Sequence, residues 1–138
     1  MHFVISLPIY LTHILISIDQ SEEELKEFLE ELGIQPKKDY GKGSVAITTS
    51  FGSWKHLIRI NTKELDSYFL TLESVIAHEA FHATTFVMKA CGIVFSNKSD
   101  EAFAYLLGYI VGEIHKKLKE STPISPCDQQ SAPEPAPH

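Results

Sequence analysis

Cysteine and basic residues are both scarce in this chain, and each scarcity excludes a class of protein. The 138 residues contain two cysteines, Cys91 in an apolar helical stretch and Cys127 in a proline-rich one, so a disulfide framework is not expected. We predict that both are reduced thiols, as in a cytoplasmic protein. Twelve Lys and Arg against eighteen Asp and Glu give a formal net charge of −6. This balance argues against nucleic acid as a partner, which requires a basic surface.

Long hydrophobic runs are also missing. The most apolar segment, residues 3–18, is shorter than the roughly 20 residues of a membrane helix, and Pro8 and His13 interrupt it. No Lys or Arg precedes it and no small-residue cleavage site follows it, so it is a poor signal peptide. We therefore expect no membrane partner. Isoleucine at every second position between 14 and 18 favours one buried strand over residues 9–19, with Pro8 at its start or at a bend before it.

Residues typical of helix ends and turns indicate the next helix and the two strands that follow it. Ser21 and Glu24 match a capping box, in which each side chain bonds the backbone amide of the other residue. Gly33 suits the position after this helix, where the backbone turns left-handed. Two strands are then expected, at 44–51 and 56–61, and a Gly-Ser turn between them predicts a hairpin.

Two long helices are expected to complete the domain. The first covers residues 72–91 with Thr71 as its N-cap, and the second covers 99–119. Residues 121–138 contain five prolines and no hydrophobic periodicity, which predicts a disordered tail. We therefore expect residues 1–120 to form a single α+β domain, in which a small antiparallel or mixed sheet packs on helices.

The pentapeptide His78-Glu79-Ala80-Phe81-His82 lies inside the first long helix. Each helical residue turns the chain by about 100°, so the two histidines share one face, one turn apart. Their imidazoles can then bind one metal ion. Glu79 lies about 100° away from His78, beside such an ion, where it can accept a proton from water.

A catalytic zinc site needs a third protein ligand and an open position. We expect Glu101, near the start of the second long helix, to supply it. On the side of that helix that we expect to face inward, Glu101 is followed by Ala104, Gly108 and Gly112. Small residues at these positions would let the two helices approach closely. The alternative is that Glu101, like Asp100, only stabilises the positive end of its helix.

H-E-x-x-H followed by Glu101-Ala102-Phe103-Ala104 resembles the gluzincin metallopeptidases, especially the short minigluzincin type. The resemblance covers about residues 44–115 and implies a zincin-like core, with the motif helix followed by the helix that bears the glutamate. It implies that His78, His82 and Glu101 bind Zn²⁺. It also implies that Glu79 is the general base. The pattern also looks like small uncharacterised proteins of bacterial viruses and prophages.

Two further roles follow from the resemblance. Such enzymes add a Tyr, His or Arg that stabilises the oxyanion, and no motif selects among the candidates here; Tyr105 is our choice, and the others are Tyr109, Tyr68 and His56. An extended substrate could add a strand to the sheet. Residues 56–60 are the expected edge because they lead into the motif helix.

The sequence thus predicts a cytoplasmic zinc metallopeptidase that hydrolyses a peptide bond in a peptide or protein substrate. One alternative is a zinc-stabilised binding protein, as a virus or prophage could encode, that captures a protein partner without hydrolysis. Another is a helical interaction domain that binds no metal. Glu79 separates the first two readings, because only hydrolysis needs a general base.

Overall fold

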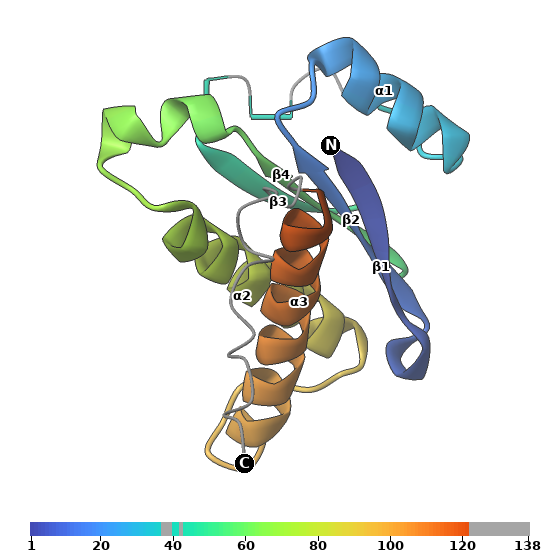
Figure 1. Ribbon diagram of the computed structural model, residues 1–138. Coiled ribbons are helices and arrows are strands. Elements are labelled where there is room, and N and C mark those ends of the chain that lie inside the picture. The colour runs from blue at the N-terminus through green and yellow to red at the C-terminus, as the bar shows by residue number, and fades with distance from the viewer. Residues whose placement is uncertain (37–39, 42, 122–138) are drawn as a thin grey trace, which may run out of the picture.

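The computed structural model describes residues 1–36, 40–41 and 43–121, and within them the fold is α+β with one small mixed sheet (Figure 1). The strands and α-helices follow in the order β1 (His2–Leu7), β2 (Thr12–Ile18), α1 (Glu22–Glu31), β3 (Ala46–Ser50), β4 (Lys55–Ile60), α2 (Leu72–Ala90) and α3 (Asp100–Ser121). Short 3₁₀ turns occupy Pro8–Tyr10, Thr62–Glu64 and Asp66–Tyr68. The expected tail falls outside the described residues, apart from Ser121 at the end of α3.

The apolar N-terminal segment forms two strands, so the expectation of one strand over residues 9–19 is wrong. β1 and β2 pair antiparallel, and the 3₁₀ turn Pro8–Tyr10 reverses the chain between them. Leu11 closes this turn in the left-handed region, with φ 50°. Pro8 begins the turn, in agreement with the bend expected there. Leucine rarely adopts a left-handed conformation, so the sequence does not show that the chain reverses into a second strand.

The strand order in the sheet is β1-β2-β4-β3. β3 and β4 pair antiparallel, which confirms the expected hairpin, while β2 and β4 pair parallel. Because β4 lies between β2 and β3, the expectation that residues 56–60 form an edge is wrong. The edge beside the motif helix is β3, the strand that comes before β4 in the chain.

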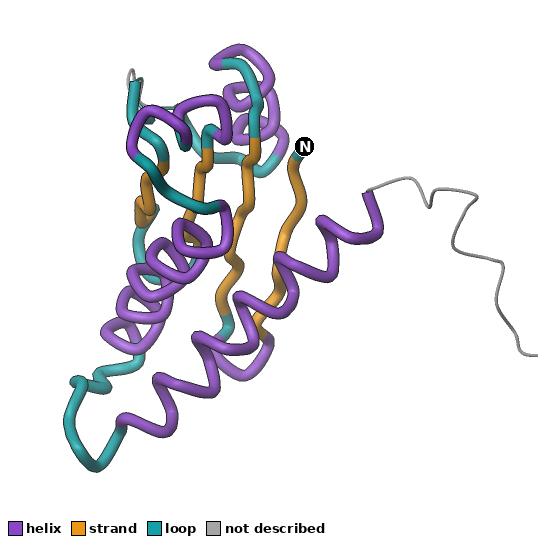
Figure 2. Tube along the Cα trace, turned by 60° about the vertical axis from the view of Figure 1, so that its left-hand side comes forward, coloured by secondary structure: helices purple, strands orange, loops and turns teal. Residues whose placement is uncertain are grey.

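The two faces of the sheet carry separate cores. One face, with Ile14, Ile16 and Ile58, packs against α2 and α3, and Figure 2 shows both long helices on the same side of the strands. The other face, with Leu15 and Leu57, packs against α1. The alternation of side chains along β2 and β4 therefore separates the long helices from α1.

The helix ends agree with the local signals. The Ser21 hydroxyl accepts a hydrogen bond from the Glu24 amide (3.1 Å), and the Glu24 carboxylate accepts one from the Ser21 amide (2.7 Å), which confirms the capping box. Gly33 follows α1 with φ 70°. The Thr71 hydroxyl accepts from the Ser74 amide at the start of α2. Among the described residues, no helix has the length and apolar character needed to cross a bilayer.

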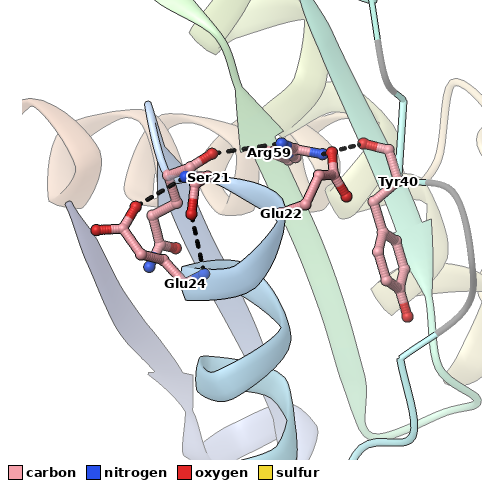
Figure 3. A network of polar contacts seen from close by, with 6 residues as sticks. Ser21, Glu22, Glu24, Tyr40 and Arg59 are labelled. Carbon is pink, nitrogen blue, oxygen red and sulfur yellow. Dashed lines mark hydrogen bonds and ion pairs between the residues drawn. The ribbon is translucent and has the colours of Figure 1, made fainter.

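Arg59 of β4 ties α1 to the sheet (Figure 3). Its guanidinium Nη1 donates to the Glu22 carboxylate at 2.6 Å and to the Tyr40 carbonyl at 2.7 Å. The Arg59 side chain is 13% exposed. One cation therefore joins the first turn of α1, the segment before β3 and the sheet itself.

Candidate metal centre

His78 and His82 lie one turn apart on the outer side of α2, and both are exposed. Their Nε2 atoms are 3.1 Å apart. Zinc binds imidazole nitrogens at 2.0–2.1 Å, so two nitrogens on a tetrahedral ion lie about 3.3 Å from each other. The pair therefore nearly has the spacing of two ligands of one zinc ion.

Glu79 points to a different side of α2 from the two histidines. It is 7% exposed, and its carboxylate Oε2 accepts a hydrogen bond from the Thr48 hydroxyl of β3 at 2.5 Å. The same hydroxyl lies 3.1 Å from the Glu79 backbone carbonyl. The carboxylate is thus held against the edge strand, beside the histidine pair.

A cleft of about 570 Å³ opens at this place. His78 and Glu79 line it from α2, and residues 43–46 line it from the chain that leads into β3. Tyr68 and Leu70 form part of its wall, from the segment before α2. One end of the cleft is therefore polar, with His78 and Glu79, and the rest of its wall is largely apolar.

Glu101 does not join this group. It is exposed at the start of α3, and the residues that α3 buries are Phe103, Leu106, Ile110 and Ile114. At 100° per residue, Glu101 points almost directly away from that buried face. Asp100 lies beside it in the first turn, and its carboxylate accepts a hydrogen bond from the Glu101 amide (2.9 Å). Within the described residues, no three His, Cys, Asp or Glu side chains form a group that could hold a metal ion.

The expected inward stripe on α3 is therefore wrong. Ala104, Gly108 and Gly112 are all exposed. A Cβ atom added at Gly108 or Gly112 would meet no atom within 4 Å. The apolar stripe that begins at Phe103 faces the core in their place, because burying large apolar side chains stabilises the fold more than close contact through small ones.

The four candidates for oxyanion stabilisation lie in different places. Tyr105 is 77% exposed and, with Tyr109, lines a separate groove beside the Pro8–Tyr10 turn. His56 is buried, and burial lowers its pKa. Tyr68 is the candidate that lines the cleft with His78 and Glu79.

Thr48 is the residue of the site that sequence reasoning missed. A threonine in a strand is common, because β-branched side chains fit sheets well, so its type carries no signal. The register could have identified it: Thr48 pairs with Ile58, which faces α2, so its side chain faces the motif helix.

The described residues can thus bring two imidazoles, a nearly buried carboxylate and an apolar cleft to one place. Two imidazoles fit a divalent transition metal such as zinc, and Glu79 lines the same cleft as His78. Comparison of the chain with protein-family models, curated proteins and solved structures finds no match.

Proposed function

We propose that the protein is a zinc-dependent metallopeptidase with a zincin-like core, in which His78 and His82 bind the ion and Glu79 is the general base. The observation that carries the proposal is the 3.1 Å separation of the two Nε2 atoms beside a nearly buried carboxylate in a cleft. Glu101 keeps its assignment as third ligand from the sequence pattern. Glu101 is exposed on α3, and the zinc content of Glu101→Ala tests this assignment.

The chemistry divides between the ion and the chain. When bound, zinc acts as a Lewis acid that lowers the pKa of water and polarises a carbonyl. Glu79 takes a proton from the attacking water and returns it to the departing amine. Tyr68 replaces Tyr105 as our candidate for the oxyanion donor, because its side chain borders the same cleft.

The edge of the sheet supports a peptide as the substrate. Among the described residues, β3 is hydrogen-bonded to β4 along one side, so its other side is free to bind an extended chain by strand addition. Val45, Leu70 and Val75 line the adjoining cleft. A substrate with an apolar side chain near the scissile bond fits this wall. We place the reaction in the cytoplasm.

A zinc-stabilised binding protein is the second candidate, and one observation favours it. Phe69 is 98% exposed in the segment before α2, beside Tyr68 and Leu70 of the cleft wall, and exposed apolar groups of this kind mark interaction sites. In this case the cleft captures a protein segment and does not cleave it. Glu79 would then be dispensable for function.

Replacing Glu79 with Gln separates the two functions. The purified wild type and Glu79→Gln are loaded with zinc and incubated with a library of unfolded peptides, and cleavage is read by mass spectrometry. The peptidase predicts cleavage by the wild type, a loss of at least about 100-fold in Glu79→Gln, and equal zinc content in both. The opposite result is that both proteins bind zinc, neither cleaves any peptide, and both bind the same peptides with equal affinity. That result would support the binding function and reject the peptidase.

A further inference from the structure

We propose that Thr48 is a positioning residue, which holds the Glu79 carboxylate in the place of a base and away from the histidine pair. This inference rests on the proposed function. Thr48 lies at the centre of the edge strand β3, and its hydroxyl donates to Glu79 Oε2 at 2.5 Å. Thirty-one residues separate the two in sequence, so the contact depends on the packing of β3 against α2.

The environment of the pair makes this contact strong. The Glu79 side chain is 7% exposed, and a carboxylate removed from water must receive hydrogen bonds to remain stable. A bond from a neutral hydroxyl to a charged carboxylate is shorter and stronger than one between neutral groups. The Glu79 backbone carbonyl is within reach of the same hydroxyl (3.1 Å). A hydroxyl has one proton to donate, so the shorter contact, to Oε2, is the bond that holds the carboxylate.

Threonine suits this role better than a flexible residue. Its branched Cβ restricts χ1, and in β3 the backbone is itself fixed by pairing with β4. The hydroxyl therefore has a defined direction, and so does the carboxylate that it holds. A glutamate without this contact could turn toward an ion on His78 and His82 and become a ligand. Thr48 thus keeps Glu79 in the position of a base and prevents it from becoming a metal ligand.

The same strand would also hold the substrate. If an extended peptide pairs with the free side of β3, its backbone is aligned by the strand whose side chain holds Glu79. The distance from scissile bond to base would then be set within one element. We therefore expect the loss of the Thr48 hydroxyl to lower kcat and to leave KM nearly unchanged, because the strand that binds the substrate remains.

A thermal double-mutant cycle tests the contact without any assay of hydrolysis. The melting temperatures of the zinc-free wild type, Thr48→Val, Glu79→Ala and the double variant are compared. We expect Thr48→Val to lower the melting temperature by about 5 °C in the wild-type background. In the Glu79→Ala background the shift should be half of this or less, because the carboxylate partner is gone. Equal shifts in both backgrounds would overturn the proposal.

Two variants serve as controls. Thr49→Val makes the same change one residue further along β3, where Thr49 pairs with Leu57 and faces the other side of the sheet; it should show no coupling to Glu79→Ala. Thr48→Ser keeps the hydroxyl and should restore at least half of the lost coupling. Failure of Thr48→Ser to do so would show that the effect comes from packing and would overturn the role of the hydroxyl.

The effect of Thr48 on catalysis is tested by measuring kcat and KM of the zinc-loaded protein on any peptide that the wild type cleaves. We expect at least a tenfold fall in kcat for Thr48→Val, a KM within twofold of the wild type, recovery in Thr48→Ser, and zinc affinity that is not weakened. A wild-type kcat in Thr48→Val would overturn the positioning role. If the wild type cleaves no peptide, the peptidase proposal fails, and the thermal cycle alone decides whether Thr48 holds the carboxylate.

Discussion

The imidazoles of His78 and His82 face each other across one turn of α2, with their Nε2 atoms 3.1 Å apart. The ring centroids lie 4.8 Å apart and the planes are inclined by 74°. The two Nε2 atoms are therefore within hydrogen-bonding distance of each other. A hydrogen bond between the rings and a shared metal ion would use the same nitrogens, so the two arrangements exclude each other.

The glycines of α3 provide a test of which way that helix faces. Gly108 and Gly112 are exposed, and a Cβ atom at either would meet nothing within 4 Å. Each Gly→Ala change should therefore raise the free energy of unfolding by about 1 kcal/mol, because alanine is the better helix former. Urea denaturation measures this. Gly92→Ala is the matched control and should destabilise, since Gly92 has φ 74°. A loss of stability in Gly108→Ala would show that this face packs against another element.

His56 should make the stability depend on pH. Its ring stacks on Phe86, its Nδ1 lies 3.1 Å from the Ser50 hydroxyl, and burial lowers its pKa from 6.5. In the unfolded chain the ordinary pKa is restored, so below about pH 6.5 the unfolded state binds the proton more readily. The contribution of His56 to stability is therefore complete above pH 6.5. It is lost as the pH falls from there toward the folded-state pKa.

Urea denaturation between pH 5 and pH 8 measures this effect. His56→Leu should flatten the part of the profile below pH 6.5, because the titrating group is removed. The exposed His13 is the control, and His13→Gln should leave the profile of the wild type unchanged. A profile that stays the same in His56→Leu would assign the acid sensitivity to another group.

The contacts of Arg59 should contribute measurably to stability. Arg59→Met keeps most of the side-chain volume but removes the bonds to the Glu22 carboxylate and the Tyr40 carbonyl. We expect a loss of about 1–2 kcal/mol, since bonds to charged groups contribute more than neutral ones and Glu22 is partly exposed. Lys26→Met is the control: its ion pair with Glu30 is longer (3.8 Å) and exposed, so its loss should cost less than about 0.5 kcal/mol. Equal losses in the two variants would contradict the role of Arg59.

Local signals predicted the elements whose ends depend on neighbouring residues. The Ser21–Glu24 capping box, the Thr71 N-cap and the β3–β4 hairpin are all confirmed because they involve residues a few positions apart. A bend at Pro8 was expected, but the full reversal that pairs β1 with β2 was not. It is closed by Leu11 in a left-handed conformation, and leucine carries none of the signals by which turns are recognised.

Tertiary placement accounts for the other differences. β4 lies between β2 and β3 because β2 pairs with β4 and not with β3, the next strand after α1. No local sequence pattern specifies this choice of partner. The facing side of α3 could have been predicted, because Phe103, Leu106, Ile110 and Ile114 form an apolar stripe at helical spacing. The small residues Ala104, Gly108 and Gly112 form a competing stripe, which lies on the exposed side of the helix. Of the candidate site, the motif predicted the His78–His82 pair and Glu79, while Thr48 required the packed structure.

The most direct test of the central claim is the zinc content of the purified protein, measured by elemental analysis after zinc is added and excess is removed. His82→Ala and Glu101→Ala are measured beside the wild type. We predict about one zinc ion per wild-type chain and a clear loss in both variants, with Glu79→Gln retaining the metal. A wild type that retains no zinc would contradict the account, and the pentapeptide would then be an ordinary part of α2. Zinc retained in full by Glu101→Ala would remove Glu101 from the proposed ligands.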